Sequence, residues 1–385
     1  MKLTDQRCTD IRRTRKLSAM LFAHQSTAAM LAATWPNIAR RRLNGAPLMK
    51  AIAYQKSLPI DHADALQDIR LPDPIATGRD LLVEIKAVSV NPVDTKIRAN
   101  VAPAEGDWKV LGWDAAGVVR AVGPDVTLFK VGDRVWYAGD LTRPGTNAEL
   151  HLVDERIVGR MPASLDFAQA AALPLTAITA WEMLFDRLQL VPGKQATPAQ
   201  LLIIGAAGGV GSIMTQLARQ LTDVTVIGTA SRPETQDWVR ELGAHHVIDH
   251  SQPLAEEVAR LGLGSFTHVV SLNQTEQHFA QVAELIAPQG RFGLIDDPFT
   301  LDIKLLKRKS VSLHWEFMYT RSMFQTADMI AQHRLLSEMA TLVDDGRLRS
   351  TVGEHFGTIN AANLKRAHAL LETNKARGKI ILEGF

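Results

Sequence analysis

Residues 201–212 read LLIIGAAGGVGS, and this stretch predicts the fold of half the chain. An apolar strand runs into a glycine-rich turn, and the turn opens a helix. Ala206, Gly208 and Gly211 occupy the positions of a dinucleotide-binding fingerprint, with Ala in place of the first Gly. Small residues let the backbone approach a pyrophosphate, and the helix N-terminus offers free N–H groups. We therefore expect cofactor contacts from Ala207, Gly208, Gly209, Val210 and Gly211.

The sequence around this turn alternates between short apolar strands and helical stretches. Repeated β-α units of this length predict a parallel, doubly wound sheet, that is, an α/β fold. The expected strands are 201–206, 224–230, 246–249, 268–272, 291–295 and 310–315, and the expected helices are 211–221, 233–242, 254–261 and 276–286.

Upstream of this region the residue pattern differs: many short β-rich runs are separated by Gly, Pro and Asp turns. Such a pattern predicts a small irregular β-barrel. Residues 165–185 are rich in Ala and Leu and are expected to be helical, and residues after about 320 return to helix before a last strand, 379–383. The expected barrel strands are 49–54, 81–90, 115–122, 134–136 and 149–153.

The end of the second expected strand, Thr229-Ala-Ser-Arg232, bears on the choice of cofactor. An NAD enzyme usually places an acidic residue at this point to bind the ribose 2′-hydroxyl. Here Ser231 and Arg232 follow the strand, and Glu234 comes only later. Because a guanidinium is suited to a phosphate, these residues predict NADPH. The alternative is that Arg232 only caps a surface loop.

Charge is distributed unevenly along the 385 residues, whose net charge is +2. Residues 1–48 hold nine basic and two acidic residues, so the remainder carries −5. An acidic body argues against nucleic acid as a partner, and no apolar run reaches the roughly 18 residues of a membrane span. The basic leader is untranslated sequence ahead of a start at Met49, an Arg-rich targeting peptide, or a disordered arm.

The only cysteine is Cys8, inside this leader. A disulfide within the chain is therefore impossible, which fits a reducing compartment and predicts a cytoplasmic location. Targeting to an organelle by the leader stays open.

Several ordered motifs together resemble one family. They are Asn91-Pro-Val-Asp-Thr95, Leu111-Gly-Trp-Asp-Ala-Ala-Gly-Val-Val119, Val122-Gly-Pro124, Gly132-Asp-Arg-Val135, the glycine-rich turn and Gly378-Lys-Ile-Ile-Leu382. From Met49 to Phe385 the chain resembles the medium-chain dehydrogenase/reductase superfamily, and most of all quinone oxidoreductases of the zinc-type alcohol dehydrogenase-like subgroup.

The resemblance implies a GroES-like barrel over 49–175 and 320–385 and a Rossmann domain over 176–319. It also implies a cleft between them, a homodimer, and Lys379 as a further cofactor contact.

Zinc is not expected, despite the name of that subgroup. Catalytic zinc takes thiolate and imidazole ligands. The family's first Cys falls near Asn91–Asp94, where there is none, and its Gly-His-Glu falls at Gly112-Trp113-Asp114. The four-Cys structural lobe is missing from the sequence as well, so we expect no metal ligands.

Without zinc, other groups must polarise the substrate oxygen. The resemblance implies an Asn and a Tyr in an Asn-x-x-Asp-Thr-Tyr stretch; this chain has Asn91 but Lys96 at the Tyr position. Both side chains can donate to an oxyanion. Alternatively, Asn91 only forms a turn and Lys96 is a solvated lysine. Thr179 matches a position that lies against the nicotinamide, and Asp94 and Asp114 either orient Lys96 or cap turns.

Together these features predict an NADPH-dependent, zinc-independent oxidoreductase that reduces a quinone, an α,β-unsaturated carbonyl or a related small carbonyl compound. The cofactor supplies the hydride, and the protein orients the reactants. Two alternatives stay open: a metal-free carbonyl or alcohol oxidoreductase, and a non-catalytic NADPH-binding redox sensor or scaffold.

Overall fold

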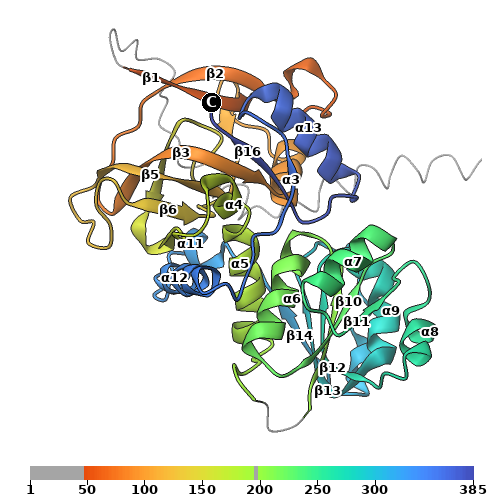
Figure 1. Ribbon diagram of the computed structural model, residues 1–385. Coiled ribbons are helices and arrows are strands. Elements are labelled where there is room, and N and C mark those ends of the chain that lie inside the picture. The colour runs from red at the N-terminus through yellow and green to blue at the C-terminus, as the bar shows by residue number, and fades with distance from the viewer. Residues whose placement is uncertain (1–46, 195–197) are drawn as a thin grey trace, which may run out of the picture.

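The computed structural model describes residues 47–194 and 198–385. It contains a domain with a parallel sheet and a second domain built on mainly antiparallel sheets (Figure 1). The expected α/β fold is thus confirmed. The hypotheses about the basic leader concern residues 1–46, which lie outside the described residues, and residues 47–48, of which Leu48 begins β1.

The parallel sheet has six strands in the order β11-β10-β9-β12-β13-β14. Alternate residues of its central strand β9 face different hydrophobic clusters: Leu201 and Ile203 pack in one, and Leu202 and Ile204 in the other. A strand buried on both faces must be apolar throughout, which explains the run LLII. The strands are β9 Gln200–Ile204, β10 Thr225–Thr229, β11 His246–Ile248, β12 Phe266–Ser271, β13 Ile286–Leu294 and β14 Ser312–Trp315.

Helices connect these strands at nearly the expected positions. They are α6 Gly209–Leu221, α7 Pro233–Glu241, α8 Leu254–Arg260, α9 Thr275–Leu285 and the short α10 Lys304–Lys307. The helical stretch before the sheet consists of α4 Phe167–Ala171, α5 Pro174–Trp181 and a π-helical turn, Glu182–Arg187.

The second domain holds a seven-stranded sheet in the order β15-β16-β3-β5-β6-β8, with β7 also on β3, and a three-stranded sheet β2-β1-β4. The last strand pairs antiparallel with β3, so that Ile380 lies opposite Val90. This pairing brings the C-terminal strand beside the segment that leads to Asn91. The strands are β1 Leu48–Tyr54, β2 Gln67–Pro72, β3 Asp80–Val90, β4 Lys109–Val110, β5 Ala115–Val122, β6 Arg134–Tyr137, β7 Leu150–Asp154, β8 Val158–Arg160, β15 Val352–His355 and β16 Lys379–Glu383.

The sequence did not indicate several short elements of this domain. These are β2, β4, β8, β15 and the helix α3 Pro92–Asn100. The preceding strand ends at Val90. Helix α3 has only two large apolar residues, Val93 and Ile97, and two residues on one face are too few to mark a helix in the sequence. Its start is fixed instead by Pro92 and by a hydrogen bond of 2.8 Å from the Asn91 N–H to the Asp94 carboxylate.

The C-terminal part adds α11 Thr320–Met323, α12 Ala331–Asp344 and α13 Ala361–Glu372. No helix among residues 47–194 and 198–385 is long and apolar enough to cross a membrane.

Arg98 joins α3 to α13 inside the second domain. Its side chain is buried and donates to the Leu58 carbonyl, to the Glu372 carboxylate and, at 3.4 Å, to Nδ1 of His368. Burial, reinforced by the Arg98 charge, lowers the pKa of His368 to about 3, so this imidazole stays neutral. A single buried guanidinium therefore ties together segments that are far apart in the sequence.

We predict that Arg98→Ala lowers the free energy of unfolding by at least about 3 kcal/mol, because it removes a buried charge-assisted network. Arg120→Ala is the control: it breaks an exposed ion pair with Glu84 and should cost no more than about 1 kcal/mol. Urea unfolding of both variants measures this. Equal small losses would show that Arg98 does not hold α3 in place.

Candidate active site

The glycine-rich turn has the geometry of an anion-binding loop. Gly205 follows β9 with φ +84°, and Gly208 is the N-cap of α6 and has no side chain to cap the helix. The first N–H groups of a helix have no partner within the helix, so here they are free to bind a phosphate. A Cβ on Gly211 would lie 2.5 Å from the Ala206 Cα, whereas a Cβ on Gly208 would meet only the Gly205 carbonyl, at 3.6 Å. The turn is therefore tight on its inner side and open at Gly208.

Three residues of other segments meet this turn. The Gly378 N–H donates to the Ala207 carbonyl at 2.9 Å and forms an isolated parallel bridge with Gly208. A Cβ on Gly209 would lie 2.8 Å from Cδ of Lys379 and 3.1 Å from Cγ2 of Thr176. The stem of Lys379 and the start of α5 thus pack directly on the predicted cofactor loop.

The ammonium group of Lys379 reaches from this loop to Asn91. Its Nζ donates to Oδ1 of Asn91, to Oδ2 of Asp114 at 2.9 Å and to the Val90 carbonyl at 3.2 Å. Asn91 in turn donates through Nδ2 to Oδ2 of Asp114, also at 2.9 Å. All three side chains are buried, and Asn91 is only 1% exposed. The bond from Lys379 fixes the amide so that its NH₂ group, and not its oxygen, faces Asp114.

Two buried carboxyl groups belong to this cluster, contrary to the idea that Asp94 and Asp114 orient Lys96. Asp114 also accepts the N–H of Leu175 at 2.8 Å, which ties it to the start of α5. Burial raises the pKa of Asp114, and Lys379 opposes this rise. Burial raises the pKa of Asp94 to about 7. These residues surround Asn91 and Lys379 instead.

The cluster does not fit a zinc ion. Its donors are amide, carboxylate and carbonyl oxygens, and an ammonium group already provides the positive charge among them. Zinc in proteins prefers imidazole and thiolate ligands in tetrahedral geometry. Within residues 47–194 and 198–385, no group of three or more His, Cys, Asp or Glu side chains could hold a metal ion.

Ser231 and Arg232 lie where the second strand of the sheet ends, as expected. Arg232 is the N-cap of α7; its Nε contacts Oε1 of Glu234 at 2.6 Å, and its Nη2 donates to the Lys375 carbonyl at 3.0 Å. The contact with Lys375 brings the loop before β16 next to Arg232. The guanidinium is partly exposed.

The other two predicted catalytic residues have polar partners other than Asn91. Thr179 is buried on α5 and donates to the Leu175 carbonyl at 2.9 Å. Lys96 is 51% exposed, and its Nζ contacts Oδ2 of Asp297 at 2.7 Å, on the loop after β13. This ion pair links the two domains at the surface. The structure does not bring Lys96 to the buried cluster, and its catalytic role stays a prediction.

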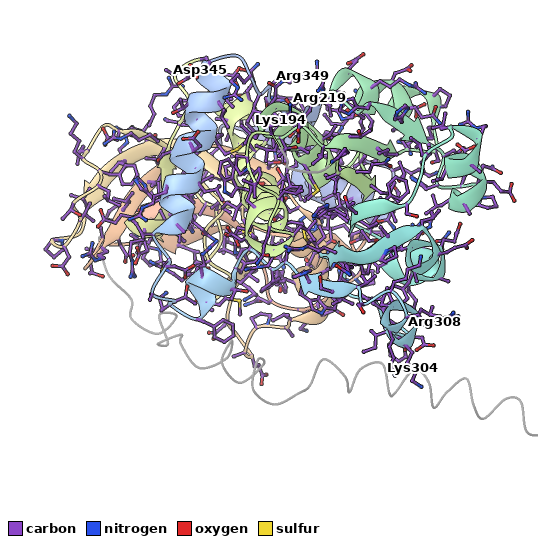
Figure 2. The ribbon with its side chains drawn as sticks, turned by 90° about the horizontal axis from the view of Figure 1, so that it is seen from below. Lys194, Arg219, Lys304, Arg308, Asp345 and Arg349 are labelled. Carbon is purple, nitrogen blue, oxygen red and sulfur yellow. The ribbon has the colours of Figure 1, made fainter. Side chains whose placement is uncertain are left out.

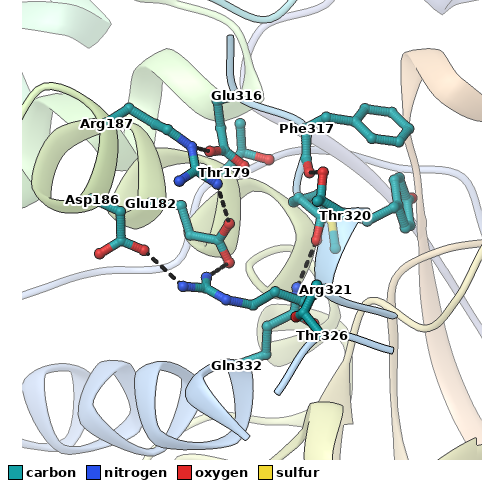
Figure 3. A network of polar contacts seen from close by, with 12 residues as sticks. Thr179, Glu182, Asp186, Arg187, Glu316, Phe317, Thr320, Arg321, Thr326 and Gln332 are labelled. Atoms are coloured by element: carbon teal, nitrogen blue, oxygen red, sulfur yellow. Dashed lines mark hydrogen bonds and ion pairs between the residues drawn. The ribbon is translucent and has the colours of Figure 1, made fainter. Parts of the chain in front are cut away.

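A second buried polar network begins one helical turn after Thr179 (Figure 3). In the π-helical turn, Glu182 lies between the guanidinium groups of Arg187 and Arg321. Arg187 also donates to Oε2 of Glu316 at 2.8 Å, directly after β14. Burial, together with the Glu182 charge, raises the pKa of Glu316 to about 9. The sequence did not indicate this network, since widely spaced Glu and Arg residues leave no local pattern.

Two hollows of about 490 and 410 Å³ lie elsewhere on the described surface. They run along β1 and the C-terminal residue Phe385, and neither is lined by the glycine-rich turn or by Asn91. We place the candidate site at the turn, because the helix N-terminus and the buried polar cluster meet there.

We predict that Glu316→Gln becomes more stable relative to the unchanged protein as the pH rises from 5 to 9. The folded protein keeps Glu316 protonated, while the unfolded chain ionises it above its ordinary pKa, so the native residue loses stability across this window. The difference in free energy of unfolding should change by up to about 1.4 kcal/mol per pH unit. Urea unfolding at several pH values measures it.

The exposed Glu338 on α12 supplies the control, Glu338→Gln, for which we expect no such trend. A pH-independent difference for Glu316→Gln would mean that Glu316 is ionised in the folded protein.

Comparisons with known proteins agree with this architecture. Residues 77–163 match the family described as alcohol dehydrogenase GroES-like domain, and residues 242–382 match the family described as zinc-binding dehydrogenase. A zinc-type alcohol dehydrogenase-like protein of Staphylococcus aureus (strain MSSA476) is 37% identical over 340 residues, which are 87% of this chain and 99% of the relative. A quinone oxidoreductase of Pseudomonas aeruginosa is 33% identical over 310 residues, 79% of this chain and 91% of the relative.

Among solved structures, a protein of Rhizobium etli CFN 42, described as a candidate zinc-dependent alcohol dehydrogenase, has a TM-score of 0.85. It is 62% identical, and the match covers 88% of this chain and 99% of that one. The resemblance inferred from the motifs is therefore confirmed. The chain belongs to the medium-chain dehydrogenase/reductase superfamily of oxidoreductases, among relatives named zinc-type alcohol dehydrogenase-like proteins and quinone oxidoreductases.

Proposed function

We propose that this oxidoreductase uses NADPH to reduce a quinone, an α,β-unsaturated carbonyl or a related small carbonyl compound. One observation carries the proposal: Lys379 packs its stem on Gly209 of the glycine-rich turn and donates from its ammonium to Asn91. The side chain of Lys379 thus connects the predicted cofactor loop directly with Asn91, the residue predicted to bind the substrate oxygen. The name of the Pseudomonas aeruginosa relative, a quinone oxidoreductase, agrees with this substrate class.

The residues at the turn fit a phosphorylated dinucleotide. The N-terminus of α6 suits a pyrophosphate, and Ser231 and Arg232 suit a 2′-phosphate. Further positive charge comes from the loop before β16, where Arg377 packs over the Trp238 ring at 4.9 Å. A backbone hydrogen bond and the contact with Arg232 lower the pKa of Glu234, and the charge of Arg377 adds to this effect. When bound, NADPH supplies a hydride to an electron-poor carbon of the substrate.

Hydride addition leaves an electron pair on the substrate oxygen, and solvent supplies the proton that completes the reduction. The chain's own part is to stabilise that oxygen. Asn91 uses one N–H of its amide for Asp114, while its contacts with the Ser89 and Trp113 carbonyls are long, 3.3 and 3.4 Å. The second N–H is therefore the donor that Asn91 can turn to a substrate.

Two other functions compete with this proposal. A carbonyl or alcohol oxidoreductase would use the same groups on another substrate, and a redox sensor or scaffold would bind NADPH without turnover. The buried Asn91–Lys379–Asp114 cluster favours an enzyme, because a binding protein has no need of a fixed donor beside the cofactor loop. Oxidation of NADPH with a panel of quinones, enones and aldehydes separates all three.

We further propose a homodimer that forms along β14, the edge strand of the parallel sheet. Trp315 and Phe317 at this edge are 52% and 47% exposed, and nearby Phe299, Ile303 and Leu305 are exposed too. Figure 2 shows Lys304 and Arg308 of the α10 segment projecting from the body, away from Lys194, Arg219 and Arg349. Such apolar exposure on an open sheet edge suits a second copy of the chain.

A cytoplasmic location stays a prediction from the sequence.

For the cofactor, we predict that Arg232→Ala weakens NADPH binding about ten- to a hundredfold and leaves NADH binding nearly unchanged. A charge-assisted contact is worth about 1.5–3 kcal/mol, and only NADPH carries the 2′-phosphate. Fluorescence titration with both cofactors measures the two dissociation constants. An equal loss of affinity for both cofactors would show that Arg232 does not bind the 2′-phosphate.

For the reaction, we predict that Asn91→Ala lowers kcat by about a hundredfold, whereas NADPH affinity stays within a few-fold. Lys96→Ala tests the second residue expected from the sequence. If turnover survives Lys96→Ala on the best substrate of the panel, Lys96 serves only its ion pair with Asp297. Unchanged turnover of Asn91→Ala would show that another group binds the oxygen.

For the metal, we propose that the enzyme works without zinc, because an ammonium group takes the place of a cation in the buried cluster. Elemental analysis of the purified protein should find no stoichiometric zinc, and activity should persist in strong chelator. One tightly bound zinc per chain, lost together with activity, is the contrary result.

A further inference from the structure

The chain has three tyrosines, and their hydroxyl groups differ in one respect. The Tyr54 hydroxyl donates to the Val101 carbonyl at 2.5 Å, and the Tyr137 hydroxyl is bonded to Nδ1 of His151 at 2.9 Å. The Tyr319 hydroxyl is buried and has no partner among the residues that the structure describes, although the residue is only 3% exposed. A buried polar group without a partner is costly and calls for an explanation, such as a ligand.

The segment that carries Tyr319 is firmly fixed. It follows β14 at the carboxyl edge of the parallel sheet, the same edge from which the glycine-rich turn leaves β9. Ligands of open α/β sheets bind at that edge. On one side of Tyr319, Glu316 is bound by Arg187; on the other, Arg321 contacts Glu182, Asp186 and Asp328 (Figure 3).

Backbone contacts fix the same segment. The Met318 carbonyl accepts from Nε2 of Gln332 at 2.6 Å, and the Tyr319 carbonyl accepts the Met323 N–H at 2.8 Å. The Tyr319 ring lies 5.4 Å from the Phe317 ring, between centroids. A side chain held this way is a pre-positioned donor, since little freedom remains to be lost when a ligand binds.

Tyr319 and Trp113, the residue before Asp114, are buried in one continuous hydrophobic core. Burial raises the pKa of Tyr319, and the carboxylates of Asp94, Asp114 and Asp140 raise it further. Trp113 joins these groups: its Nε1 donates to the Asp140 carbonyl at 3.2 Å, and its own carbonyl contacts the Asn91 amide. Because its pKa is raised, the Tyr319 hydroxyl keeps its proton at neutral pH and can donate a hydrogen bond.

We infer that the Tyr319 hydroxyl donates a hydrogen bond to the substrate oxygen, as a second donor beside Asn91. This inference rests on the proposed reduction of a carbonyl compound. It makes Tyr319 a catalytic residue, in the role that the resemblance would give to position 96. Lys96 is instead exposed and paired with Asp297.

The experiment compares Tyr319→Phe with Tyr54→Phe, two variants that each lose one hydroxyl. With NADPH and either 1,4-benzoquinone or 2-cyclohexen-1-one, Tyr319→Phe should lower kcat at least about tenfold, with the Kd for NADPH within twofold. Its Tm without cofactor should equal or exceed that of the unchanged protein, because the lost hydroxyl had no partner. Tyr54→Phe should show the reverse: a lower Tm and a kcat within threefold.

Three results would overturn the inference: a kcat of Tyr319→Phe within threefold of the unchanged protein, a Tm lowered by several degrees, or a loss confined to NADPH affinity. If the unchanged protein oxidises NADPH with neither probe, the proposed function fails separately. The contact is then judged by binding of 2-cyclohexen-1-one to the NADP⁺ complex, measured by tryptophan fluorescence. Weaker binding to Tyr319→Phe supports it, and equal or undetectable binding to both proteins rejects it.

Discussion

The buried ammonium group of Lys379 is the contact on which the rest of the site depends. A charge in the interior is stable only when its partners compensate for lost water, and here Asn91, Asp114 and the Val90 carbonyl do so. The same partners are thereby fixed: the amide of Asn91 has one orientation, and Asp114 stays connected to the start of α5. Because the stem of Lys379 lies on Gly209, the charge also determines how the antiparallel domain meets the nucleotide turn.

Much of the fold follows from local sequence. LLII before the glycines gave a strand buried on both faces, and β5 and β16 were found with the expected bounds, since alternation and turn residues mark them clearly. The elements that could not be predicted from the sequence are those whose stability comes from contacts with distant parts of the chain. α3 depends on its caps and on Arg98, and β15 depends on its pairing with β16, more than 20 residues further along the chain.

The site was predictable only in part, for a related reason. The glycine-rich turn and Arg232 occur in contiguous motifs, and the resemblance supplied Asn91 and Lys379. By contrast, Glu182, Glu316 and Tyr319 lie outside these motifs, and their surroundings are formed only in the tertiary structure. Lys96 shows the limit of transfer by alignment: the residue holds the expected position in the sequence, yet its side chain points to Asp297 at the surface.

The place of β16 in the structure has a consequence for how the protein is made. This strand contains residues 379–383, yet it pairs with β3, residues 80–90, and its first residue completes the surroundings of Asn91. A ribosome delivers the chain from the N-terminus, and domains fold as their residues emerge. The parallel sheet, complete at residue 315, can form while the antiparallel domain still waits for its last strand. During synthesis, then, the nucleotide turn can form first, whereas Asn91 receives the ammonium group of Lys379 only after residue 379 has left the ribosome.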